Sequence, residues 1–136
     1  MRSTLAYLLL IAFGLAAGGC STEYAVHSRL DNTLTQYTDL LERSDYEGTS
    51  FFAAPAVAEE YQWKVEAAKN VQVLHCQTLR VNYDEPRGVA EVLVEIEYYS
   101  LRTLKVRTIR DNQRWIYVKG NGSPQWKLMT PLPDFP

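Results

Sequence analysis

Residues 90–99 constrain the fold most strongly, because apolar and mainly acidic side chains alternate along them without interruption. The two alternating sets are Ala90, Val92, Val94, Ile96 and Tyr98, and Glu91, Leu93, Glu95, Glu97 and Tyr99. Successive side chains of a β-strand point to opposite faces of its sheet. This stretch is therefore predicted to be a strand of an antiparallel sheet that has one face in the core and the other in water.

Three further strands are expected around this one. Residues 71–83 also alternate with a period of two. Their odd positions would share one face: Val71, Val73, His75, Gln77, Leu79, Val81 and Tyr83. Residues 103–118 are interpreted as one long strand with a bulge or bend at 111–113, where polar residues interrupt the alternation. Residues 126–129 would form a short last strand, because the prolines that follow it prevent further pairing.

The charges predict a register for the hairpin that follows Tyr99. With a turn at residues 100–102, acidic residues would face basic ones outside and apolar residues would face each other inside. The opposed pairs would be Glu97 with Lys105, Glu95 with Arg107, Leu93 with Ile109, Ile96 with Val106 and Tyr98 with Leu104. Each facing pair of opposite charges contributes about 0.2–1 kcal/mol. A slip by one residue would turn one apolar face to water.

Two helices are expected before the sheet. Leucine and tyrosine recur at spacings of three and four residues and indicate an amphipathic helix that ends near Ser44. Its apolar stripe is Leu30, Leu34, Tyr37, Leu40 and Leu41. A second helix begins at Pro55, which suits a first helical position, and ends near Asn70. Residues 44–48 would form a turn between them. The single stripe is expected to cover the sheet of the same domain, rather than a partner helix or a membrane surface.

The first 20 residues have the organisation of an export signal. Met1-Arg2 is cationic, residues 5–17 are apolar, and Gly18-Gly19-Cys20 closes the segment with small residues. The apolar run is shorter than the roughly 20 residues that span a bilayer. The segment resembles the lipobox of bacterial lipoproteins, although Ala17 stands where that family prefers leucine. In that family the cysteine is acylated and the peptide is cut before it. The alternative is a plain signal peptide in which Cys20 has no special role.

The lipobox resemblance implies three segments and a location. These are a cleaved signal peptide at 1–19, a lipidated tether at 20–23 and one domain at 24–136. Ser21 stands where an inner-membrane retention signal would resemble aspartate, so the periplasmic face of the outer membrane is expected. With Cys20 lipidated, Cys76 has no cysteine to pair with and is expected to be a small buried residue. The formal charge of −2 does not suggest binding to nucleic acid.

The order of the expected elements resembles the NTF2-like (nuclear transport factor 2) superfamily, and in particular its small bacterial lipoproteins. The resemblance covers residues 24–133. It rests on Ser44-Asp45-Tyr46-Glu47, on Trp115-Ile116-Tyr117-Val118, on Trp126-x-Leu128 and on Pro131-Leu132-Pro133. It implies an α+β fold: N-terminal helices packed on a curved antiparallel sheet of about four strands, forming a cone. A cystatin-like fold with one helix on a meander is the alternative, but it leaves residues 55–68 without a place.

The superfamily includes enzymes and binding modules, so the fold alone does not assign an activity. Its enzymes place Asp, His or Tyr side chains inside the cone. The residues that would line such a pocket here are Tyr37, Tyr61, Trp63, His75, Tyr98 and Trp115. His75 is a candidate general base, but a lone histidine is more often structural. The two histidines and the one remaining cysteine do not form a metal-ligand set, and no cofactor motif is present.

The sequence therefore predicts a lipid-anchored envelope lipoprotein that acts as a non-catalytic binding or scaffolding module. A partner protein, or a second copy of the chain, would dock on the exposed face of the sheet. A binder of a small apolar ligand inside the cone is the first alternative. An enzyme of the isomerase or dehydratase type is the second.

Overall fold

The computed structural model of this chain describes residues 20–120 and 122–136. The expected signal peptide at 1–19 lies outside the described residues, and of Cys20 and Ser21 only the backbone is described. The elements in chain order are α2 (Cys20–Glu42), α3 (Tyr46–Ser50), the 3₁₀ helix η1 (Pro55–Val57), α4 (Ala58–Ala67), β1 (Val71–Asp84), β2 (Val89–Ser100), β3 (Val106–Val118) and β4 (Gln125–Leu128). None of the helices described is both long and apolar enough to cross a membrane.

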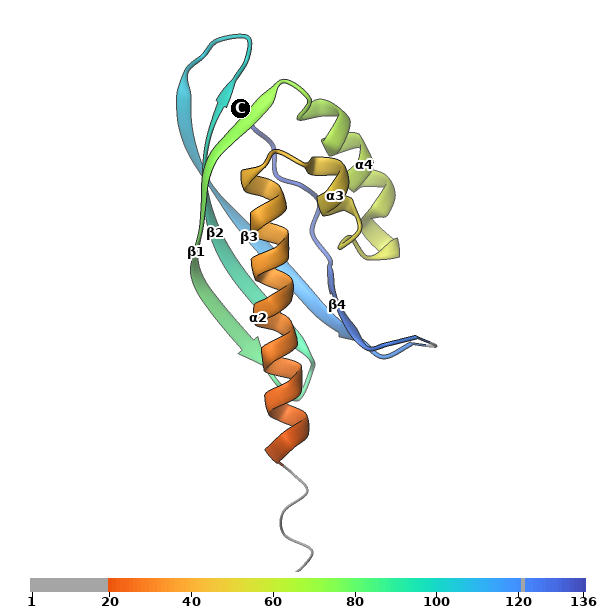
Figure 1. The fold of residues 1–136 in the computed structure, drawn as a ribbon. Coiled ribbons are helices and arrows are strands. Elements are labelled where there is room, and N and C mark those ends of the chain that lie inside the picture. Colours follow the sequence, from red (N-terminus) through yellow and green to blue (C-terminus); the bar gives the residue numbers. More distant parts are fainter. Residues whose placement is uncertain (1–19, 121) are drawn as a thin grey trace, which may run out of the picture.

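The four strands form one antiparallel sheet in the order β1-β2-β3-β4. Figure 1 shows α2 running along one face of this curved sheet, with α3 and α4 beside it. The α+β class that the sequence predicts is confirmed. Because α3, η1 and α4 fill residues 46–67, the arrangement is not that of a single helix on a meander.

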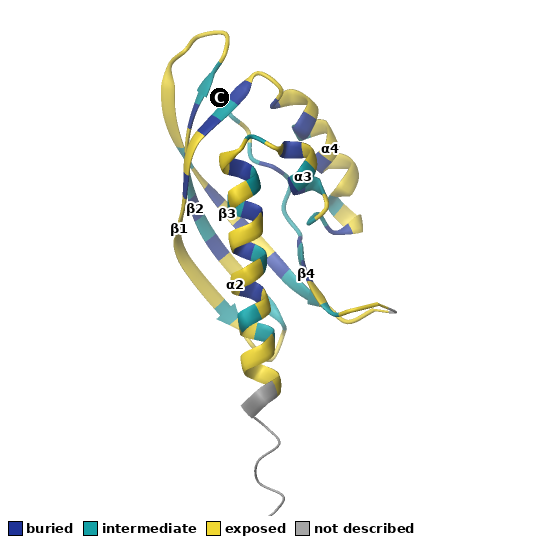
Figure 2. Cartoon of the chain, viewed as in Figure 1, coloured by how far each residue is buried: buried dark blue, intermediate teal, exposed yellow. Residues whose placement is uncertain are grey.

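Helix α2 buries the predicted stripe against the sheet. Its buried residues are Leu30, Leu34, Tyr37 and Leu41, while Leu40 is half-buried. Figure 2 shows buried, dark-blue patches recurring along α2 between exposed, yellow ones. The residues expected as a lipidated tether, 20–23, are the first turn of α2.

The turn expected at residues 44–48 is present only at its start, because residues 46–48 belong to α3. The helix ends in a Schellman motif, in which the backbone amides of Ser44 and Asp45 bond to the carbonyls of Leu41 and Leu40. Ser44 takes the left-handed conformation with φ +56°. Asp45 then caps the short helix α3, because its carboxylate accepts the amide of Gly48 at 2.8 Å.

The inward row of β2 is as predicted. All five residues of the row are at most 2% exposed: Ala90, Val92, Val94, Ile96 and Tyr98. They belong to the same core cluster as the stripe of α2. Pro55 also opens its helical segment as expected, and α4 turns Tyr61 and Val65 into the core. The second helix ends at Ala67 rather than near Asn70.

Strand β1 departs from strict alternation, so the expected shared face of His75 and Val73 is wrong. Its pairing with β2 shifts between Val73 and His75 and again between Thr78 and Arg80. An extra residue in one strand reverses the facing of the residues beyond it. Val73 and Cys76 are consequently buried, and His75 is exposed. Cys76 is a free, buried cysteine, as expected.

The hairpin between β2 and β3 has a different register from the predicted one. Glu95 lies opposite Arg110, and Ile96 lies opposite Ile109, a shift of three residues. The turn is longer than expected because Leu104 adopts φ +55° and its amide bonds to the carbonyl of Ser100 at 2.7 Å. A shift by an odd number turns the other set of β3 side chains inward.

The expected bulge at residues 111–113 is also absent from the structure described. Pairing between β2 and β3 runs without a register shift from Val89–Ile116 to Tyr99–Val106. Asp111 and Gln113 are therefore inward-facing core positions of a regular strand, and both are buried. The polar residues interrupt the alternation of the sequence, but they do not interrupt the strand.

Candidate functional site

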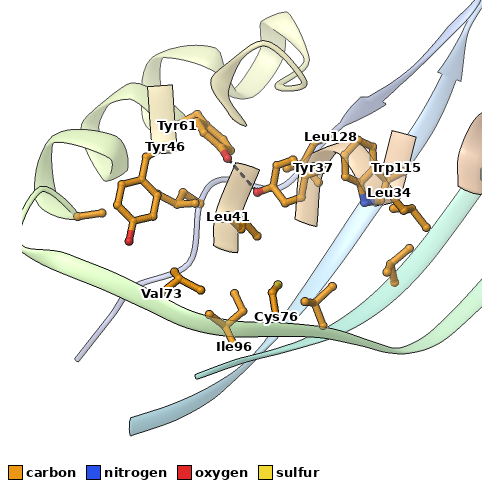
Figure 3. Close-up of a cluster of buried hydrophobic side chains, with 14 of the residues drawn as sticks. Leu34, Tyr37, Leu41, Tyr46, Tyr61, Val73, Cys76, Ile96, Trp115 and Leu128 are labelled. Atoms are coloured by element: carbon orange, nitrogen blue, oxygen red, sulfur yellow. Dashed lines mark hydrogen bonds between the residues drawn. The ribbon is translucent and has the colours of Figure 1, made fainter. Parts of the chain in front are cut away.

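The interior of the cone is filled by its own side chains. Tyr37, Tyr61 and Trp115 were expected to line a pocket, but each has 0% of its surface exposed. A cavity wide enough for one water molecule beside any of them would leave some surface accessible. Figure 3 shows these rings packed between the helices and the sheet. Large rings at the centre of a small domain serve here as core.

The buried hydroxyl groups of this core are satisfied by one another. The Tyr61 hydroxyl donates to Thr49 Oγ1 at 2.8 Å, and the hydroxyls of Tyr37 and Tyr61 lie 2.9 Å apart. Thr49 Oγ1 in turn donates to the carbonyl of Tyr46 at 2.7 Å. Burial raises the pKa of Tyr61 to about 12 and that of Tyr37 well above its ordinary value. Both phenols are therefore neutral at physiological pH, and this series of hydrogen bonds has a structural role.

Three residues of β3 add a second buried polar chain that the sequence did not reveal. Gln113 Nε2 donates to Asp111 Oδ2 at 2.9 Å, and Trp115 Nε1 donates to Gln113 Oε1 at 3.0 Å. Burial raises the pKa of Asp111 to about 6, although the bond from Gln113 lowers it. Alternation of residues 111, 113 and 115 was the signal for this chain. This signal was missed because a bulge was expected at residues 111–113, which took Asp111 and Gln113 out of the inward-facing row that contains Trp115.

The remaining expected pocket residues lie elsewhere. The imidazole of His75 is outside the core, where Nδ1 lies 3.0 Å from Glu42 Oε1. Trp63 is 71% exposed on α4. Tyr98 is buried and donates its hydroxyl to the main-chain oxygen of Pro136 at 2.6 Å. The six residues therefore do not converge on one pocket, and His75 has no buried reaction chamber around it.

The same Glu42 oxygen that faces His75 also accepts the backbone amide of Cys76 at 3.0 Å. The Glu42 side chain thus satisfies an amide of the edge strand β1 just beyond its first register shift. Burial raises the pKa of the Cys76 thiol to about 12, so the sulfur stays protonated and unreactive. Among residues 20–120 and 122–136, no group of three or more His, Cys, Asp or Glu side chains is placed to hold a metal ion.

A surface cleft of about 280 Å³ lies at the end of the molecule where α2 begins. Its walls are the first residues of α2, the turn between β1 and β2, and the end of β3. Aromatic and charged residues share the lining: Glu23, Tyr83, Glu85, Arg87, Tyr117 and Lys119. A hydrogen bond between the Glu23 and Glu85 side chains, together with the charge of Glu23, raises the pKa of Glu85. Both signs of charge meet in this cleft.

The outer face of the sheet carries exposed leucines between neutralised charges. Leu74 and Leu79, the residues at the two register shifts of β1, are 47% and 41% exposed. Arg110 Nε lies 3.2 Å from Glu95 Oε2, and Arg114 forms a longer ion pair with Glu91. The short edge strand β4 is covered by residues 52–54, which bond to both polar backbone groups of Leu128. Register shifts on β1 and this cover on β4 both discourage addition of a further strand.

No protein-family model and no curated protein sequence matches this chain. Solved structures with a similar fold include the following two. The first is a SEC-C motif-containing protein from Psychrobacter arcticus, 9% identical, with a TM-score of 0.59. The alignment covers 79% of this chain and 62% of that protein, so the chain spans less than two thirds of its length.

The second similar structure is the TraE protein, which was solved in complex with 2-(2-furyl)isonicotinic acid. It is 18% identical with a TM-score of 0.51, and the alignment covers 74% of this chain and 90% of TraE. At these identities the likeness concerns the fold alone. The two comparisons therefore agree with the α+β architecture, and the resemblance to NTF2-like lipoproteins stays a prediction.

Proposed function

We propose that this chain is a lipid-anchored module of the bacterial cell envelope that works by non-catalytic binding at its surface. The observation that carries the proposal is the filled interior, in which Tyr37, Tyr61 and Trp115 leave no exposed surface. A substrate or apolar ligand inside the cone would have to displace this core. The geometry therefore favours a surface-binding module over both an interior ligand carrier and an enzyme.

The anchor part of the proposal rests on the apolar and small residues that precede Cys20. Residues 20–42 are helical, so a lipid on Cys20 would hold this end of α2 against the bilayer. Tyr83 and Tyr117 of the adjoining cleft would then lie near the headgroups. Tyrosine is enriched at that depth because its ring is apolar and its hydroxyl is polar.

Replacing the proposed anchor cysteine tests this part directly. Cys20→Ser is expected to move the protein from the membrane fraction to the soluble fraction, and mass spectrometry should find acyl chains only on the native protein. Cys76→Ala is the matched control, because it removes the other thiol and should leave the protein in membranes. Retention of Cys20→Ser in the membrane fraction would refute the anchor.

A substitution at Ser21 tests which of the two membranes holds the protein. We place the protein on the periplasmic face of the outer membrane because Ser21 replaces the aspartate of a retention signal. Density-gradient separation should find the native protein in outer-membrane fractions and the Ser21→Asp variant in inner-membrane fractions. A native protein found with the inner membrane would overturn this location.

For the binding surface we propose the outer face of the sheet, with a second copy of the chain as the occupant. Its glutamates and arginines neutralise each other, so two such faces do not repel, and Leu74 and Leu79 offer apolar area. Sedimentation in a non-ionic detergent should show a dimer that Leu79→Glu dissociates. Phe51→Glu, on the helical side, should leave it intact. A native monomer at high concentration would refute the second copy and favour a different partner protein.

A further inference from the structure

The turn between β2 and β3 concentrates positive charge at one end of an otherwise acidic chain. Residues 98–110 contain four basic residues and no acidic one, although the formal charge of the whole chain is −2. Arg110 is paired with Glu95. The other three, Arg102, Lys105 and Arg107, form no ion pair with any residue in the described part of the chain. This end of the molecule therefore has uncompensated positive charge.

These three cations lie around one cleft of about 230 Å³. Arg107 lies directly opposite the buried Tyr98, so it belongs to the inward-facing row of the sheet, at the end that the helices leave uncovered. Arg102 and Lys105 come from the turn. Phe135 forms the apolar wall of the cleft and packs edge to face on the buried Tyr98, with ring centroids 5.0 Å apart. Pro136 also lines the cleft, and its main-chain oxygen accepts the Tyr98 hydroxyl.

The turn that presents these cations is held in place by its own hydrogen bonds. Ser100 Oγ accepts the amide of Arg102 at 3.2 Å, and Thr103 Oγ1 accepts the amide of Lys105 at 3.4 Å. The Leu101 amide also bonds to the carbonyl of Asn70 at 2.8 Å, which ties the turn to the start of β1. The Ser100 and Thr103 hydroxyls line the cleft and keep their hydrogens to donate.

We propose that this cleft is an anion site that binds a phosphate group of a larger ligand. Three cations and two hydroxyl donors supply more positive charge than one carboxylate needs, and they match a phosphate group, which carries about −1.5 to −2 at neutral pH. Arginine forks bind phosphate oxygens in pairs. The partly exposed ring of Phe135 would contact the uncharged part of the ligand.

The position of the cleft in the molecule limits which phosphate-bearing ligands can reach it. Figure 1 shows the β2–β3 turn at the end of the molecule opposite the first residues of α2. The 23 residues of α2 span about 35 Å, while charge interactions at physiological salt are screened over about 8 Å. If the proposed anchor holds the start of α2 at the bilayer, headgroups of that same membrane do not compete for the cleft. The orientation rests on the proposed function, whereas the binding chemistry does not.

Titration calorimetry of the full chain in a non-ionic detergent tests the site. Inorganic pyrophosphate should bind one-to-one with a dissociation constant below about 1 mM. Arg107→Gln should weaken this binding about tenfold or more, and Arg107→Lys, which keeps the charge but loses the fork, should weaken it less. The matched control is Arg114→Gln, which removes the same charge from the outer face and should change the affinity less than twofold.

A second probe distinguishes two sources of phosphate. Glycerophosphoglycerol is a phosphodiester with the chemistry of a deacylated lipid headgroup. Binding of pyrophosphate alone would assign the cleft to a terminal phosphate, and binding of both would assign it to a headgroup type of ligand. Absence of saturable binding by either probe would overturn the proposal. Equal weakening by Arg107→Gln and Arg114→Gln would also overturn it, since it would show diffuse attraction without a site. Neither result depends on whether Cys20→Ser leaves the membrane.

Discussion

The buried carboxyl group of Asp111 predicts an unusual dependence of stability on pH. Its side chain is inside the core, where it accepts one hydrogen bond from Gln113, and its pKa rises from 3.8 to about 6. A carboxyl group with a higher pKa in the folded state than in the unfolded chain destabilises the fold as the pH rises from the lower pKa to the higher one, because the unfolded chain ionises first. Asp111 therefore does not destabilise the protein below pH 3.8. The destabilisation grows as the pH rises to about 6 and is constant above that.

The size of the effect follows from the shift. Each pKa unit corresponds to about 1.4 kcal/mol, so ionisation of Asp111 costs about 3 kcal/mol of folding free energy at pH 7.5. At pH 4 the unfolded carboxyl is only partly ionised, and the cost falls to about 0.5 kcal/mol. Asp111→Asn keeps the acceptor for Gln113 but cannot ionise. Relative to the native protein, it should therefore gain about 2–3 kcal/mol of stability on going from pH 4 to pH 7.5.

Urea unfolding followed by tryptophan fluorescence at both pH values measures this difference. Any pH-independent effect of the asparagine on stability is the same at both pH values, so it drops out of the comparison. The other carboxyl groups are common to both proteins, so their titration drops out as well. Asp39→Asn, on the exposed side of α2, is the matched control and should run parallel to the native protein. If the difference between Asp111→Asn and the native protein is the same at both pH values, Asp111 is hydrated and the interior described above is wrong.

Three further changes test the backbone, the hydroxyl chain and the inner face. Gly88→Ala should cost about 1–2 kcal/mol in a urea titration, because Gly88 has φ +59°. Tyr61→Phe should cost about 1–3 kcal/mol by leaving the Tyr37 hydroxyl without its partner, and adding Tyr37→Phe should cost less than the sum of the two single changes. Val94→Asp should prevent folding, as seen by circular dichroism, because it buries a second carboxylate opposite Asp111. A normal melting curve for Val94→Asp would place this residue on the outer face.

The sequence predicted those elements whose pattern is local and repeats several times. The five inward residues of β2 and the leucine stripe of α2 each repeat their period often enough to specify one face. Burial on that face then leaves few alternative registers with the core. Pro55 likewise marks the start of its helical segment because its ring fixes φ and removes a donor.

The sequence-based prediction failed where a single residue breaks the regular alternation of a strand or lengthens a turn. An extra residue near Leu74 turns His75 outward, and the sequence around it contains no glycine or proline to signal an irregularity. The left-handed Leu104 lengthens the next turn in the same unsignalled way. That three-residue error in register reversed β3, and the bulge expected at residues 111–113 concealed Asp111 as a core position. A polar residue can occupy such a position only when it finds partners there, and periodicity alone does not show the partners.

The proportions of the fold differ at its two ends. The strands β1, β2 and β3 have 12 to 14 residues. Figure 1 shows that the β2–β3 turn extends past the helices, whereas at the other end the first turns of α2 extend past the strands. Inward-facing positions near the β2–β3 turn therefore lose their cover and line the cleft of about 230 Å³, while α2 itself forms a wall of the cleft of about 280 Å³. The cleft beside the start of α2 contains both Glu23 and Lys119 and gains no net attraction for an ion. The cleft at the β2–β3 turn has only cations among its charged side chains, so charge selection is built into the end that points away from the proposed anchor.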